Sequence, residues 1–121
     1  MRWSATEFEE LVDQALDGLP DWVRERMDNV SIVVAPWPTA YQLRAVERGK
    51  GAMLLGLYEG VPLPKLNGRD SHASPDRITL FQGPLERAAF EDQALLRLIR
   101  HTIIQEIAHH FGFSEAEIRD L

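Results

Sequence analysis

The chain has 121 residues, the length of about one domain, and its 45% hydrophobic and 26% charged residues exclude a disordered or fibrous protein. It has no cysteine, which excludes disulfides, cysteine-ligated zinc and thiol chemistry. Its formal net charge of −6 disfavours binding to nucleic acid or to an anionic membrane, because both need a surplus of cations.

The N-terminal segment does not resemble a secretion signal, because acidic residues interrupt it from Glu7 to Asp13. Charged residues also interrupt the longest apolar stretch, residues 94–108, so it does not have the pattern of a membrane span. We therefore expect a cytoplasmic protein that forms a single domain over residues 1–121.

The first predicted element is a helix over residues 5–17. Ser4 and Glu7 have the spacing of a capping box, and apolar residues follow at steps of three and four. Gly18 predicts the end of this helix. A second, short helix is expected over residues 21–27.

Three segments have the apolar, β-branched composition of strands: residues 30–34, 53–60 and 77–81. The polar and proline-rich residues 61–76, between the last two of them, predict a loop. A Gly-Pro pair at residues 83–84 predicts a turn that leads the chain out of the third strand.

A brief helix is expected between the first two strands, where Thr39 and Gln42 form a second capping pattern before a run that ends near Val46. A long helix is predicted over residues 92–111. Its apolar residues lie on nearly all sides, which is typical of a buried helix. Gly112 is suited to follow it in the left-handed conformation.

Ser114 and Glu117 have the spacing of another capping box, which predicts a last short helix. The order of these elements predicts an α+β fold, in which a short mixed sheet packs against the buried helix. The side chains of Trp22 and Trp37 are expected in the core.

The fragment QEIAHHFGFSE, residues 105–115, has features of a zinc-peptidase helix. Such a helix places two metal ligands at i and i+4, which stacks them on one face, and a glutamate after the first ligand acts as the general base. Glu106 has the position of the base and His109 that of the second ligand. The first ligand position holds Gln105. Glu115 lies at the third ligand position of the extended pattern, three residues after a glycine.

Glu115 also has a simpler interpretation, because the helix dipole favours a carboxylate in the first turn of the predicted last helix. Two other histidines are poor substitutes for the missing ligand. His101 precedes His109 by about 12 Å along the helix axis, too far to share an ion, and His110 points about 100° away from His109. His72, in the predicted loop, is the remaining candidate.

Several strings of the sequence resemble, in order, a bacterial family of minimal zincin-like metallopeptidases, formerly a domain of unknown function. They run from FEELVDQALDGLP and DNVSIVVAPWP through LLGLYEGVPL and PDRITLFQGPL to RHTIIQEIAHHFGFSEAEIRDL. The family's usual ending reads HEIAHHFG and has an aspartate in place of Glu115. The resemblance implies a zincin fold, the role of base for Glu106 and zinc-ligand positions at His109 and Glu115. It also implies that the strand 77–81 is the edge that lines a substrate cleft.

Gln105 departs from the family pattern, because a glutamine carbonyl is a weaker zinc donor than an imidazole. Losing most of one ligand corresponds to ~3–5 kcal/mol of metal binding, or about two to four decades in affinity. We therefore expect weak or absent zinc and lost or reduced peptidase activity, in a fold kept for binding a peptide or protein. The alternative is an active zinc-dependent metallopeptidase with Glu106 as general base. Neither a substrate nor an oligomeric state follows from the sequence.

Overall fold

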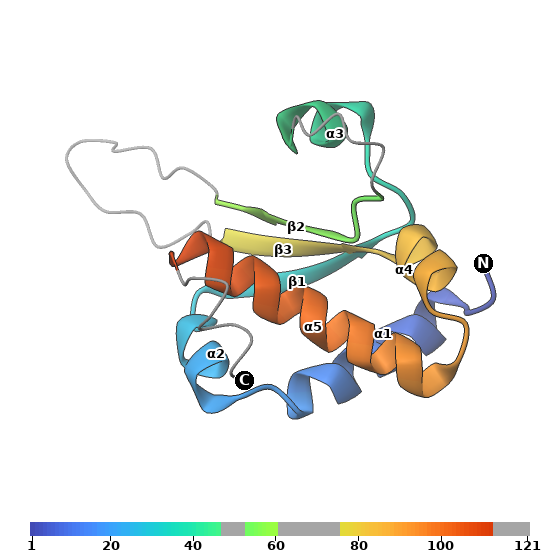
Figure 1. The fold of residues 1–121 in the computed structure, drawn as a ribbon, viewed down its shortest axis with the longest axis horizontal. Helices are drawn as coiled ribbons and strands as arrows, with labels where there is room; N and C mark the ends of the chain where they lie inside the picture. Colours follow the sequence, from blue (N-terminus) through green and yellow to red (C-terminus); the bar gives the residue numbers. More distant parts are fainter. Residues whose placement is uncertain (47–52, 61–75, 113–121) are drawn as a thin grey trace.

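The computed structural model of the protein describes residues 1–46, 53–60 and 76–112 (Figure 1). The predicted last helix, most of the predicted loop, His72 and Glu115 lie outside these residues. The observed elements confirm the α+β class. The helices are α1 (Ala5–Asp17), α2 (Asp21–Arg26), α3 (Ala40–Val46), α4 (Gln82–Ala88) and α5 (Asp92–His110), and the strands are β1 (Val30–Ala35), β2 (Gly56–Glu59) and β3 (Asp76–Phe81).

Helix α1 begins and ends where its sequence predicts. The Ser4 hydroxyl accepts a hydrogen bond from the Glu7 amide at 3.0 Å, and the Ser4 amide donates to the Glu7 carboxylate at 2.8 Å. This reciprocal pair satisfies amide groups that have no partner inside the helix. At the other end, the Gly18 amide donates to the carbonyls of Ala15 and Leu16.

The three strands form a mixed sheet in the order β1-β3-β2. Strand β1 pairs parallel to β3 with Ile32 opposite Ile78, and β2 pairs antiparallel to β3 with Tyr58 also opposite Ile78. The expectation that residues 77–81 form the edge of the sheet was therefore wrong, because β3 is the central strand. The edge strand that lies against α5 is β2.

Helix α5 packs against α1 and against strands β2 and β3. Figure 1 shows α1, α2 and α5 on one side of the sheet and α3 on the other. Buried side chains from α1, α2, β3, α4 and α5 make a shared apolar core, which stabilises the fold by removing apolar surface from water. Its largest fully buried members are Phe8, Val23, Ile78, Leu80, Leu85, Leu95, Ile99, Ile103 and Ile107.

The predicted turn at residues 83–84 was wrong, because these residues lie in the first turn of α4. Pro84 is tolerated there since the first amides of a helix have no intrahelical acceptor. Trp37 was also misplaced, because 44% of its surface is exposed, whereas Trp22 packs against the core as expected. None of the helices in the described residues is long and apolar enough to cross a membrane.

Candidate active site

The last two turns of α5 carry the motif residues. Gln105 and His109 are one helical turn apart and therefore share a face of the helix. Glu106 and Gln105 are half-buried, whereas His109 is exposed. The helix then stops as predicted: Gly112 has a φ of 82°, a left-handed conformation that glycine adopts at little cost.

Glu106 makes the contact that joins α5 to the edge of the sheet. The amide of Tyr58, 48 residues earlier in the chain, donates a hydrogen bond of 2.9 Å to Oε1 of Glu106. Burial raises the pKa of the Glu106 carboxyl above its ordinary value, while the Tyr58 amide and the charge of His109 oppose the rise. This carboxyl therefore holds its proton to a higher pH than an exposed glutamate does.

The register of β2 explains why this amide faces the helix. The Phe81 amide donates to the Leu55 carbonyl at 3.0 Å, so the main chain of Leu55 points toward β3. Main-chain groups alternate along an antiparallel edge strand, and those of Gly56 and Tyr58 consequently point away from the sheet. Glu106 thus binds the edge of β2 at a position where an added strand would form a hydrogen bond.

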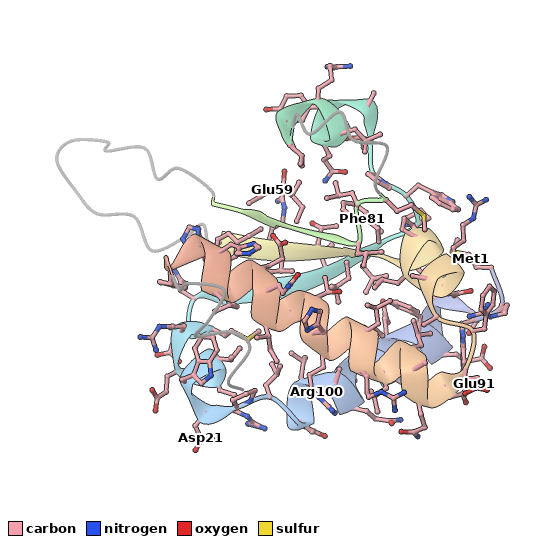
Figure 2. The ribbon with its side chains drawn as sticks, in the orientation of Figure 1. Met1, Asp21, Glu59, Phe81, Glu91 and Arg100 are labelled. Carbon is pink, nitrogen blue, oxygen red and sulfur yellow. The ribbon has the colours of Figure 1, made fainter. Side chains whose placement is uncertain are left out.

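An open pocket of about 540 Å³ lies where this contact is made. Helix α3, strand β2 and helix α5 each contribute to its walls, and Figure 2 shows Glu59 between β2 and α3. A volume in this range suits a small ligand or a few peptide side chains. Its lining residues are Ala45, Val46, Leu54, Gly56, Leu57, Tyr58, Glu59, Glu106 and His109.

A second group of contacts ties the end of α5 to the sheet. The Tyr58 hydroxyl donates to Oδ2 of Asp76 at 2.7 Å, and the His110 ring stacks on the Tyr58 ring with 3.8 Å between the ring centres. Nε2 of His110 is 3.9 Å from the same Asp76 oxygen. Burial, followed by the hydrogen bond and the charge of Asp76, raises the pKa of the Tyr58 hydroxyl. These contacts fix the Tyr58 side chain between the end of α5 and the start of β3.

The described residues of this site do not make up a complete zinc site. His109 supplies one imidazole, and Gln105 supplies a neutral amide that zinc binds less readily. Within residues 1–46, 53–60 and 76–112, no three histidine or acidic side chains are grouped so that they could hold a metal ion. Glu115, the remaining ligand position, lies outside these ranges.

The structure brings together two of the predicted site residues, Glu106 and His109, in the wall of one pocket. Gln105 is not among the lining residues, and the ring of His101 is exposed on α5. Tyr58 was missed by the sequence analysis. The composition of residues 53–60 predicts a strand, but which amide of that strand faces α5 depends on its pairing with β3.

Comparison with known proteins gives a family and a fold. The family model described as zincin-like metallopeptidase matches residues 27–121. Among solved structures, a conserved hypothetical protein from Thermus thermophilus is similar, with a TM-score of 0.59 and 20% sequence identity over 89% of this chain and 94% of that chain. At this identity the likeness concerns the fold alone. No protein of curated function matches.

Proposed function

Since the chain belongs to the zincin-like metallopeptidase family, we propose that it is a peptide-binding member of that family whose zinc site has lost a ligand. In this proposal zinc binds weakly or not at all, and peptidase activity is reduced or lost. The observation that carries the proposal is Gln105, which stands at the first ligand position, one turn before His109.

The donor chemistry of Gln105 supports a weakened metal site. Its carbonyl oxygen carries no charge and is a poorer zinc donor than the imidazole nitrogen that the motif requires. With His109 as the one imidazole ligand, the other positions around a zinc ion would be filled by water and Glu115. An affinity loss of about two to four decades relative to a complete site is the expected consequence.

The contact of Glu106 with the edge strand also supports the proposal. A general base needs its carboxylate within reach of the water that it deprotonates. Oε1 of Glu106 accepts the Tyr58 amide at 2.9 Å, so one of its two oxygens already has a structural partner. In the proposed role this carboxylate holds β2 against α5 and keeps the pocket in shape.

Peptide binding is supported by the position of the pocket along an edge strand. The main chain of Gly56 points outward there, so an extended segment is able to pair with the strand by β-augmentation. The apolar side chains of Val46, Leu54 and Leu57 in the pocket wall would then contact its side chains. His109, which also lines the pocket, would donate or accept a hydrogen bond.

An active zinc-dependent metallopeptidase is the second candidate, and one observation favours it. Burial raises the pKa of Glu106, as general bases that work near neutral pH require. In this alternative Glu106 takes the proton from the attacking water through Oε2, while Oε1 keeps the Tyr58 amide. Peptidase activity that a chelator and Glu106→Gln both abolish would establish this second candidate.

The test is a zinc titration of the wild type and of Gln105→His, with metal content measured by mass spectrometry on untagged protein. We expect little metal in the wild type and a gain of two decades or more in affinity in the variant, because the substitution restores an imidazole at i relative to His109. The matched control is Gln93→His, an exposed residue of the same helix about 18 Å from Gln105 along its axis.

Two outcomes contradict the proposal. Near-stoichiometric zinc in the wild type would show that other ligands complete the site. Equal gains from Gln105→His and Gln93→His would show that position 105 is not at the metal.

A further inference from the structure

A second pocket lies near the far end of α5, at the start of that helix, away from the site described above. It has a volume of about 250 Å³. Three of the eight exposed large apolar side chains of the described residues line it: Phe90 is 76% exposed, Met1 64% and Trp37 44%. Apolar side chains gathered around one hollow are typical of a docking surface rather than of scattered surface residues. We call this hollow the arginine–aromatic pocket, and its principal lining residues are Arg2, Trp37, Gly83, Glu86, Arg87 and Phe90.

One wall of the arginine–aromatic pocket is a tryptophan held flat against a helix. The Trp37 ring lies so close to Gly83 that any added Cβ would overlap it. The Gly83 amide donates to the Pro36 carbonyl at 2.9 Å, which fixes the chain next to the ring. The guanidinium of Arg87, one turn after Gly83 on the same face of α4, lies 4.9 Å from the centre of the Trp37 ring.

A second arginine–aromatic contact lines the same pocket. The Arg2 guanidinium lies 5.1 Å from the centre of the Phe90 ring. Two hydrogen bonds hold Arg2 there: its amide donates to Glu86 at 2.7 Å, and its guanidinium donates to the Ala89 carbonyl at 2.6 Å. Both arginines are therefore positioned before any partner binds, which lowers the entropy lost on association.

The charge at this pocket is opposite to that of the whole chain. The formal net charge is −6, yet two guanidinium groups flank the opening. The one carboxylate of the lining, Glu86, is buried, and its two oxygens accept hydrogen bonds from the Arg2 amide and from the Gln82 side chain. A ligand thus meets cations at the rim and apolar surface inside.

We propose that the arginine–aromatic pocket docks an acidic segment of a partner protein, with an apolar side chain in the pocket and carboxylates against Arg2 and Arg87. The volume is below the range of about 300–1,000 Å³ typical of small-molecule sites, and it suits one or two side chains. Tryptophan and arginine are the residues most enriched in the energetic centres of protein interfaces. Each guanidinium also keeps a planar fork of donors that matches a carboxylate.

The probe is a fluorescein-labelled peptide in which glutamate alternates with leucine around a central phenylalanine. Its analogue has each glutamate replaced by lysine. Fluorescence anisotropy at low and at physiological ionic strength measures both affinities. We expect the glutamate peptide to bind at least about tenfold more tightly than the lysine analogue, and to weaken as salt is added.

Two variants locate the binding. Arg87→Glu reverses one rim charge and Phe90→Ala removes an exposed ring, and each should weaken the glutamate peptide by about tenfold. Arg97→Glu, an exposed arginine on α5, is the control with the same change of charge and should leave the affinity within about twofold. Circular dichroism confirms that the variants fold.

The proposal is overturned if the two peptides bind equally, if neither binds, or if Arg97→Glu weakens binding as much as Arg87→Glu. It is also overturned if a single-stranded oligonucleotide binds more tightly than the glutamate peptide, because stacking on Trp37 and Phe90 would then serve nucleic acid. Self-association that Arg87→Glu abolishes would assign the pocket to a second copy of this chain instead.

Discussion

Glu106 accepts a hydrogen bond from the main chain of an edge strand, and this contact commits one of its two carboxylate oxygens to holding β2 against α5. The same side chain stands at the base position of the peptidase motif. Its environment explains both roles. Burial favours the protonated form, whereas the Tyr58 amide and His109 favour the ionised form, and burial has the larger effect.

The raised pKa of Glu106 predicts how stability depends on pH. Below its ordinary pKa of 4.5 the carboxyl is protonated in both the folded and the unfolded chain. Between 4.5 and the raised value only the folded chain keeps the proton, so the free energy of unfolding falls as pH rises through this window. Urea unfolding of the wild type and Glu106→Gln should show the wild type losing stability relative to the variant between acidic and neutral pH. The control is Glu9→Gln, at an exposed glutamate of α1. If the stability difference between the wild type and Glu106→Gln does not change with pH, or changes as it does for Glu9→Gln, the raised pKa of Glu106 is contradicted.

At the scale of elements, the approach of β2 to α5 depends on one glycine. A Cβ at Gly56 would lie 2.7 Å from Cγ2 of Thr102 on α5 and 3.3 Å from the Thr79 carbonyl on β3. Gly56 precedes Tyr58 by two residues on the same edge, so any displacement of β2 also moves the amide that binds Glu106. The shape of the candidate site thus depends on close packing between a strand and a helix.

Gly56→Ala should lower the free energy of unfolding by about 1–3 kcal/mol, because the added methyl group overpacks this contact. Exchange of the Tyr58 amide with solvent, followed by NMR, should become faster in the variant as the hydrogen bond to Glu106 lengthens. Gly60→Ala is the matched control, since among the described residues its Cβ would meet only Asp76, at an ordinary 3.5 Å. If Gly56→Ala and Gly60→Ala change the free energy of unfolding and the exchange of the Tyr58 amide equally, the close contact at Gly56 does not position β2.

At the scale of the whole molecule, the core extends beyond the segment that the family model matches. The match begins at residue 27, but α1 and α2 bury side chains against α5. Phe8 and Ala15 of α1 are fully buried. Residues 1–26 are therefore part of the same packed unit as the candidate site.

Phe8→Ala should cost about 3–5 kcal/mol of stability, because it removes a large buried ring and leaves a cavity between α1 and α5. That is a large share of the roughly 5–15 kcal/mol typical of a domain. Urea unfolding measures it, with Glu9→Ala on the exposed face of α1 as the control. A loss below about 1 kcal/mol would mean that α1 does not unfold together with the rest of the chain.

Features that depend on short-range spacing could be predicted without any knowledge of the fold. The capping box of Ser4 and Glu7, the extent of α1, and the left-handed Gly112 after α5 follow from interactions within about four residues. The peptidase motif was recognisable for the same reason, since helical periodicity alone places Gln105 and His109 on one face. The family that these residues indicated is the one whose model matches the chain.

Features that depend on contacts between distant segments could not be predicted in this way and became visible only in the folded chain. Composition identified three strands but not their order, because parallel pairing of β1 with β3 joins segments separated by α3 and β2. That order makes β3 central and turns the Tyr58 amide toward Glu106, 48 residues away. The position of Trp37 is another such feature, because its ring packs on Gly83 and stays partly exposed. The burial of a side chain depends on neighbours that the local sequence does not specify.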